Sequence, residues 1–258
     1  MSKVINISGS YVQDQKHSKV SDRFNVIQAS SVGDAMASHG LSLVSLSTGR
    51  AKHADKADFQ RTLSRYRGPE IADGVFLDIV YSSKHMGRGV DCLYVGIFRS
   101  VCTNGLFTGT SFFQHNVRHS GNTYDNLNLG IAAALGMQGK LADTIKRLQG
   151  IVLTPEQREL LALEAVKLLT PEKALQVKHR LLKSTGRIED SGLDAWTSYN
   201  VIQENGMQGN NIAYTLNRTD LLGRDNVRHM AARPIKTNSV KDAEFNQGLF
   251  DAVLKIAA

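Results

Sequence analysis

The chain has 258 residues, 41% hydrophobic and 21% charged, which excludes a disordered chain and allows one large domain or two small ones. Two cysteines exclude a disulfide-stapled scaffold, and the lack of any apolar run near the roughly 18 residues of a membrane span predicts a soluble, cytoplasmic protein. The formal net charge of +7 makes a polyanion a reasonable partner.

The first part of the chain has the pattern of strands separated by polar loops. Short apolar segments predict strands at residues 4–7, 24–27 and 43–46. Residues 75–81 and 92–99 are rich in β-branched and aromatic side chains and flank a Gly-containing segment, which predicts a β-hairpin.

A turn and then helices are predicted after this hairpin. Asn104 and Gly105 tolerate positive φ and predict a tight turn that reverses the chain. Apolar residues recur near the helical period from Leu127 to Leu148, and the glycines within that run, Gly136 among them, could split it into two helices.

Two Leu-Thr-Pro-Glu segments, at residues 153–156 and 169–172, have the composition of helix starts. In each, Thr is a suitable N-cap, Pro suits the first helical position and Glu suits the positive helix end. They predict one helix to about Leu169 and a second that continues through Leu182. Residues 195–206 and 245–256 also have a helical pattern, with Gly- and Asn-rich loops between them.

These elements predict an α+β fold, with antiparallel sheet or hairpins in the first half packed on helices of the second half. No linker rich in Pro or Ser interrupts the chain. We therefore expect a single domain over residues 1–258, with a possible division into a strand-rich part (1–125) and a helical part (126–258).

Enzyme motifs are absent from the sequence. We find no Gly-x-Ser-x-Gly, no phosphate-binding loop and no His-Glu-x-x-His, so we predict no catalytic residue and no cofactor. Cys92, Cys102, His115 and His119 include zinc-ligand types, but their spacing fits no zinc ribbon or finger, and buried thiols beside surface histidines explain them better.

Basic residues gather in three stretches. Residues 50–67 hold six Lys or Arg against two Asp, residues 173–187 hold five with no acid, and residues 218–236 hold five against two Asp. Lys and Arg that neutralise phosphates provide sequence-independent affinity for nucleic acid. Each stretch alone is more simply explained as a solvated face.

Aromatic, basic and imidazole side chains alternate between Phe112 and Ser120, a mixture suited to stacking on bases and pairing with phosphates. The alternative is that Phe112 and Phe113 belong to the core beside a polar edge. For Arg118 and His119 the two interpretations carry similar weight.

Residues 96–106 (Gly-Ile-Phe-Arg-Ser-Val-Cys-Thr-Asn-Gly-Leu) and 118–121 (Arg-His-Ser-Gly) resemble the signature of the phage/plasmid-like proteins known as domain of unknown function 932. Residues 196–204, 233–235 and 246–250 resemble later parts of that family. The resemblance covers about residues 70–255. It implies a mobile-element origin and assigns no activity. Phe250 stands where the family usually has Trp, and the segment Lys84-His85-Met86-Gly87-Arg88 is more basic than the family pattern.

The order of a β-hairpin sheet followed by a helix is similar to that of the Rad-fifty-two superfamily of single-strand annealing proteins. Annealing requires a basic groove that holds single strands extended, with no nucleophile or metal, and an oligomer that lengthens the groove. We therefore predict a single-stranded DNA-binding protein of the host cytoplasm, a homo-oligomer such as a ring or filament, that promotes annealing in recombination. The predicted nucleic-acid contacts are Arg99, Arg118, His119, Lys140, Lys146 and Arg147.

Alternatives from other classes stay open. A metal-dependent nuclease could use His115 and His119 with a carboxylate such as Asp78 or Asp125. An inhibitor of a host defence system could act by binding a protein. Arg99 and Arg118 could instead be buried ion-pair partners that hold the turn.

Overall fold

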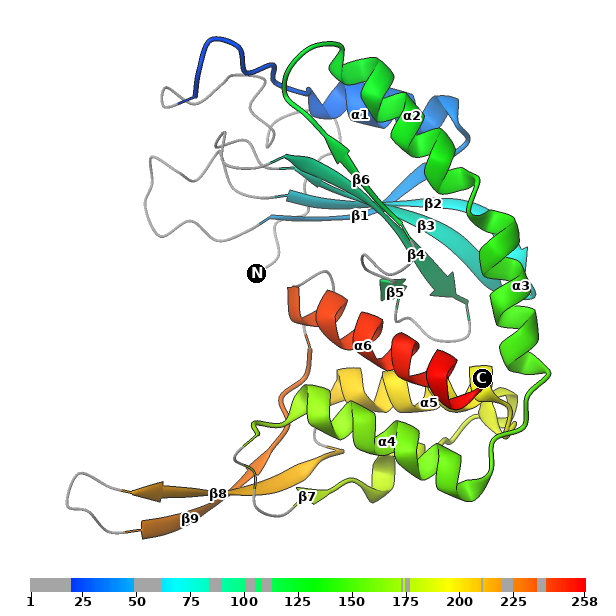
Figure 1. Cartoon of the computed structure of the whole chain (residues 1–258), viewed down its shortest axis with the longest axis vertical. Helices are drawn as coiled ribbons and strands as arrows, with labels where there is room; N and C mark the ends of the chain where they lie inside the picture. Colours follow the sequence, from blue (N-terminus) through cyan, green and yellow to red (C-terminus); the bar gives the residue numbers. More distant parts are fainter. Residues whose placement is uncertain are drawn as a thin grey trace. The chain divides into compact units, whose positions relative to one another are not determined.

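The structure is a computed structural model that describes residues 20–48, 62–83, 90–100, 105–107, 113–172, 174, 177–209, 211–219, 225–235 and 240–258 (Figure 1). Its contacts divide the chain into two compact units. The first unit contains Met1–Ser100 and Gly109–Leu141, and the second contains Val101–Thr108 and Ala142–Ala258. In the part of the chain described, no helix has the length and apolar character needed to cross a membrane.

The first unit is built on an antiparallel sheet, in which β1 to β4 pair in sequence order and β6 pairs with β4. Its strands are β1 (Ser42–Thr48), β2 (Thr62–Ala72), β3 (Val75–Ser83), β4 (Asp91–Arg99) and β6 (Gln114–Val117). The strand predicted at 43–46 and the hairpin predicted over 75–99 are confirmed. The core of this unit includes Leu77, Ile79, Leu93, Val95 and Ile97, all fully buried.

Helices α1 (Ala29–Ser38) and α2 (Thr123–Leu135) lie side by side on this unit, where α1 contacts β1 and α2 contacts β3, β4 and β6 (Figure 1). Asn122 caps α2 by accepting a hydrogen bond from the Asp125 amide, 3.3 Å away. A glycine allows the close approach of α2 to the sheet, since a Cβ atom on Gly130 would collide with the side chains of Leu93 and His115.

The strand predicted at residues 24–27 is wrong, because this segment is used to bind another part of the unit. The Asn25 amide donates to the His119 carbonyl, 2.7 Å away, and the Phe24 ring stacks on the His119 ring. Sequence patterns also missed α1, a ten-residue helix whose buried residues are Val32, Ala35 and Met36. Residues 4–7, Cys102 and Asn104 lie outside the described residues.

The predicted split of the long helical run is confirmed. After α2, residues Gly136 and Met137 form a turn, and α3 (Gln138–Gln149) follows. Leu141, Ile145 and Leu148 are fully buried at the spacing expected of one helix face. This helix begins in the first unit and ends in the second, so the boundary at Leu141 differs from the division expected after residue 125.

Three helices that contact one another form the centre of the second unit: α4 (Pro155–Leu169), α5 (Ala195–Gln208) and α6 (Val240–Ile256). They confirm the helices predicted to start at Thr154, at 195–206 and at 245–256. Tyr199 packs its ring on Trp196 and edge-on against Phe250, with centroids 5.8 and 5.3 Å apart. Strand β5 (Gly105–Phe107) belongs to the same unit and contacts α6.

The helix predicted to start at Thr170 is wrong. Thr170 ends α4, since its backbone is extended (φ −112°, ψ 150°), and its amide and hydroxyl both donate to the Val166 carbonyl. The chain then forms β7 (Val177–Lys178) and two short 3-10 helices, η3 (Arg180–Lys183) and η4 (Ile188–Asp190).

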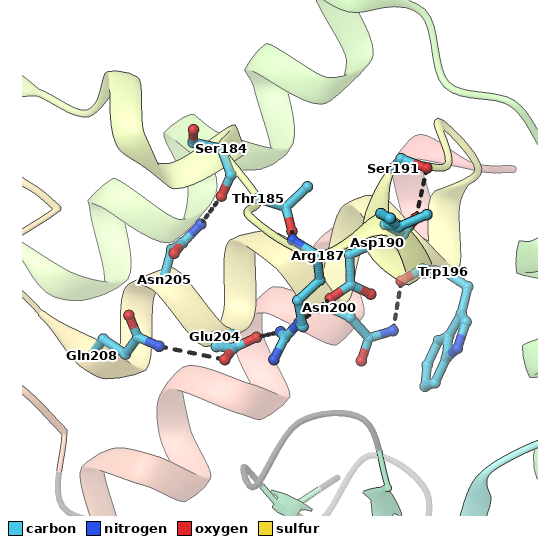
Figure 2. A network of polar contacts seen from close by, with 11 residues as sticks. Ser184, Thr185, Arg187, Asp190, Ser191, Trp196, Asn200, Glu204, Asn205 and Gln208 are labelled. Atoms are coloured by element: carbon cyan, nitrogen blue, oxygen red, sulfur yellow. Dashed lines mark hydrogen bonds and ion pairs between the residues drawn. The ribbon is translucent and has the colours of Figure 1, made fainter.

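Polar contacts hold this irregular segment against α5 (Figure 2). Arg187 donates through Nε to Asp190, 2.8 Å away, and pairs with Glu204 of α5. The Asn205 side chain donates to the carbonyls of Leu182 and Ser184 at 3.0 and 2.8 Å. Side chains of α5 thus satisfy backbone groups that a helix would have satisfied internally.

After α5, where Gly- and Asn-rich loops were predicted, two strands complete a second, smaller sheet. It consists of β7, β8 (Ala213–Thr219) and β9 (Asp225–Ala231) in that order. Strands β8 and β9 pair over their full length, from Ala213 with Ala231 to Thr219 with Asp225. The α+β fold class is confirmed, with this small sheet as an addition to the mainly helical second half.

Candidate nucleic-acid interface

One end of the first sheet collects residues that are far apart in the sequence. Thr48 of β1 pairs with Thr62 of β2, which pairs with Ser83 of β3. Asp91, at the start of β4, pairs with Val117 of β6. We call this edge, defined by these five residues, the sheet end.

A buried carboxylate lies at the sheet end. Asp91 is fully buried and accepts hydrogen bonds from the Tyr81 hydroxyl, from Ser83 Oγ at 3.1 Å and from His119 Nε2 at 3.0 Å. Burial, together with the charge of Asp91 and the hydrogen bond to it, raises the pKa of Tyr81 well above its usual value. The phenol therefore keeps its proton and donates a hydrogen bond to Asp91.

His119 is held on both of its ring nitrogens. Its Nδ1 lies 3.0 Å from the Asn25 carbonyl oxygen, which can only accept, and its Nε2 faces the Asp91 carboxylate. Burial lowers the pKa of His119, but the hydrogen bond and charge of Asp91 outweigh it, so that this pKa is raised. Both nitrogens then donate, as in an imidazolium. With its ring also stacked on Phe24, 4.2 Å away, His119 is 7% exposed and positions the backbone beside it.

Three polar side chains form an exposed row next to this network, which we call the β6 face: Gln114, Asn116 and Arg118. They alternate with half-buried His115 and buried Val117, as the two faces of a strand require. Asn116 Oδ1 accepts from Gln114 Nε2 at 2.8 Å and from Cys92 Sγ at 3.3 Å. Among the described residues, neither the Asn116 Nδ2 group nor the Arg118 guanidinium has a hydrogen-bonding or ionic partner.

The connections that begin and end at the sheet end are basic in sequence. Strand β1 ends at Thr48 and β2 begins at Thr62, while β3 ends at Ser83 and β4 begins at Asp91. The intervening residues, 49–61 and 84–89, hold six Lys or Arg against two Asp, and they lie outside the described residues. Six of the fifteen Lys and Arg residues of this unit are therefore in the two connections that begin and end at the sheet end.

Comparison with known proteins agrees with the resemblance in the sequence. The model of DUF932, a domain of unknown function, matches residues 16–245. The chain belongs to the DUF932 family. Its match extends from the first unit through α5 and the β8–β9 strands into α6.

Two Escherichia coli (strain K12) proteins are similar to this DUF932 chain. They are the UPF0380 proteins YafZ and YfjQ, each 26% identical over 201 residues, which cover 78% of this chain and 74% of the relative. No solved structure matches the chain.

The structure does not bring all the predicted contact residues of this DUF932 protein together. Arg99 is half-buried at the far end of β4 from Asp91, about 27 Å along the strand from the sheet end that Arg118 adjoins. Lys140, Lys146 and Arg147 are exposed on α3, away from its buried face. Lys140 and Arg147 lie on one side of that helix, and Lys146 is about 100° further round.

Asp78, which the nuclease hypothesis used, is engaged by two arginines in the middle of the sheet. Arg67 donates through Nε to Asp78 Oδ1 at 2.7 Å and through Nη2 to Oδ2 at 3.3 Å, and Arg65 Nη1 lies 3.6 Å from Oδ2. The Arg67 guanidinium also lies 3.5 Å from the centre of the Phe98 ring. These contacts give Asp78 a structural role in the sheet.

The other ligand-type side chains of the sequence analysis also have partners. His115 Nε2 lies 3.0 Å from the Asn126 carbonyl, and Asp125 contacts the Asn122 side chain. Within the described ranges, no group of three or more His, Cys, Asp or Glu is arranged to hold a metal ion.

Two of the five Lys and Arg residues in the basic stretch at residues 173–187 are paired with acids in the folded protein. Lys183 and His179 both contact Glu159 of α4, and Arg187 contacts Asp190 and Glu204. Hydrogen bonds from Lys183 and His179 lower the pKa of Glu159, which keeps this carboxylate ionised. Glu159, His179 and Lys183 line a cavity of about 820 Å³. The other lining residues are Val177, Lys178, Leu181, Asn211 and Ala213. Acids distant in sequence thus neutralise cations that a local count leaves unpaired.

Sequence reasoning missed Asp91, Tyr81 and Ser83. One signal was available, since Tyr81 and Ser83 are two residues apart on a strand and share a face. An Asp at the start of the partner strand could have been expected to meet them, but the register needed to place it there is not readable from the sequence.

Proposed function

We propose that this DUF932 protein binds single-stranded nucleic acid along the β6 face and promotes annealing of complementary strands. The supporting observation is the pair of exposed donors, Asn116 Nδ2 and Arg118, next to the sheet end where basic connections begin and end. Arg, Asn and Gln side chains commonly contact the phosphates and sugars of nucleic acids. Such contacts hold a strand and leave its bases accessible for pairing.

The buried network supports the proposal by holding Arg118 in position. Arg118 lies between Val117, which pairs with Asp91, and His119, which Asp91 and Asn25 hold. Its backbone is therefore ordered before a ligand binds, which reduces the entropy lost on binding. In this proposal His119 positions Arg118 and does not contact the strand itself.

A further contact would come from the exposed Lys140 of α3, which belongs to the same unit as the β6 face, whereas Lys146 and Arg147 of that helix belong to the second unit. A homo-oligomer would place several β6 faces along one strand, and affinity would then rise through multivalency. Light scattering with and without a single strand tests this part of the proposal. An unchanged monomer mass in both conditions would contradict it.

The first experiment is fluorescence anisotropy of a labelled single strand at several salt concentrations, on the native protein and on Arg118→Glu. We expect at least about ten-fold weaker binding by the variant and a salt slope lower by about 0.7. The matched control is Lys167→Glu, the same charge reversal at an exposed lysine of α4. If both variants bind like the native protein, the β6 face is not the site.

Complementary strands and magnesium, added in parallel, separate this proposal from the two alternatives. Faster duplex formation with intact DNA supports annealing. Cleavage that requires the metal supports a nuclease. A strand that stays unbound at low salt overturns the proposal and leaves an inhibitor that binds a protein.

A further inference from the structure

The β8–β9 pair is a two-stranded ribbon that extends away from the helices of its own unit (Figure 1). Seven residue pairs join the two strands, whereas β7 pairs only with Tyr214 and Ala213, at one end of β8. Beyond these two residues, no third strand pairs with the ribbon among the described residues.

Both faces of the outer part of the ribbon are exposed. Asn226, Val227, Arg228 and His229 are four consecutive exposed residues of β9, and Val227 is 59% exposed. Side chains alternate between the two faces of a strand, so neither face packs on another element there. An isolated two-stranded ribbon is only marginally stable in water, which makes so much exposure costly unless the ribbon has a partner.

The ribbon is attached firmly at its base. Thr215 is buried, the Ala232 amide donates to the Ile212 carbonyl at 2.9 Å, and the Ile235 amide donates to the Met207 carbonyl at 2.8 Å. The exposed part is therefore carried by a structured base.

The charge of the ribbon and of the segment that follows it indicates what the partner is. Arg228 of β9 and Arg233, two residues after the end of β9, are exposed, and neither forms an ion pair with any residue in the described part of the chain. Residues 213–235 hold four Arg and one His against two Asp. This contrasts with Lys183 and Arg187 of the same unit, which acids neutralise. The partner is expected to be a polyanion.

We propose that the β8–β9 ribbon enters the major groove of double-stranded DNA, with Arg228 and Arg233 on the phosphates. Two strands about 4.8 Å apart, with their side chains, fit a groove about 12 Å wide, and seven residues reach about 24 Å along it. The major groove of A-form RNA is too narrow to admit side chains, so the ribbon selects duplex DNA over duplex RNA. The inference goes beyond the proposed function, because it concerns the other unit and a duplex.

The test uses the full chain with Arg228→Ala and Arg233→Ala combined, and a labelled DNA duplex titrated between about 50 and 200 mM salt. We expect duplex affinity to fall roughly ten-fold and the salt slope to fall by about 2, since each lost phosphate contact removes about 0.9. Single-strand affinity should stay as in the native protein. The charge-matched control combines Lys167→Ala and Lys255→Ala, two exposed lysines of the same unit.

Unchanged duplex affinity in a folded ribbon variant, checked by circular dichroism, overturns the inference. Native protein that binds duplex RNA as tightly as duplex DNA also overturns it. The outcome is independent of the β6 face, because Arg118→Glu tests single-strand binding separately. If the native protein does not bind single strands but binds duplex DNA through the ribbon, only the proposed function is refuted.

Discussion

Each unit contains a histidine–carboxylate pair, and the two pairs differ in burial. His119 and Asp91 of the first unit are 3.0 Å apart, with side chains 5% and 0% exposed. His179 and Glu159 of the second unit are closer, at 2.7 Å, but 19% and 40% exposed. Charges interact more strongly where water is excluded, so the longer, buried pair is expected to contribute more. We therefore expect burial, and not distance, to decide which pair contributes more to stability.

The pairs also differ in what depends on them. Asp91 serves Tyr81, Ser83 and His119 together, and water cannot replace it. Glu159 serves Lys183 and His179 at the wall of an open cavity, where water can take its place. Loss of the buried Asp91 carboxylate leaves several buried donors without an acceptor, whereas loss of the exposed Glu159 carboxylate leaves its partners hydrated.

The largest effect is expected from Asp91→Ala. The change leaves a buried imidazolium and two hydroxyl donors without their acceptor, so the free energy of unfolding should fall by about 3–5 kcal/mol in urea denaturation. A loss below about 1 kcal/mol would contradict the importance given to burial. If the variant does not fold, Tyr81→Phe removes one donor and should cost about 1.5–3 kcal/mol.

The pH dependence of stability should follow His119. Its pKa is raised in the folded protein, so its stabilisation is complete below the unfolded value of about 6.5 and is lost as the pH rises through the folded value. Of the groups that face it, Tyr81 has a pKa raised well above 10 and does not titrate in this range. Urea midpoints should therefore fall as the pH rises above about 6.5.

His119→Gln provides the comparison for this pH profile. The variant should be less stable than the native protein at low pH and show a flatter profile above it, because the titrating group is gone. Equal slopes in both proteins would show that another group is responsible.

The smallest effect is expected from Glu159→Ala. Its two partners are solvated, so the loss should be at most about 1 kcal/mol, measured by the same denaturation. A loss as large as that of Asp91→Ala would remove the distinction between the pairs.

The sequence predicted the fold correctly where interactions between residues close in sequence determine the local structure. Thr154 starts a helix because Gln157 stands three residues on and completes a capping box, with bonds of 2.9 and 3.2 Å. At the second Leu-Thr-Pro-Glu the corresponding residue is Lys173, and Pro171 follows a completed helix, where proline is a stop signal. The residue three positions after each Thr, Gln157 or Lys173, therefore distinguishes the segment that starts a helix from the one that ends a helix.

The rest depended on contacts between distant residues. Residues 213–231 contain Gly- and Asn-flanked polar stretches typical of loops, and only their mutual pairing makes them strands. Arg118 was identified from its neighbours in sequence, but its link to Asp91 depends on the pairing of β4 with β6. The cancellation of charge at Lys183 and Arg187 likewise comes from acids that local counting cannot see.

The bond between His119 and the Asn25 carbonyl joins residues 94 positions apart in the chain. Closing so long a loop is entropically costly and is repaid only after the intervening strands have formed, so this contact should be among the last to appear in folding. A nascent or partly folded chain would then lack the ordered Arg118 surface. On the proposed function, this surface would bind a single strand only once folding is complete.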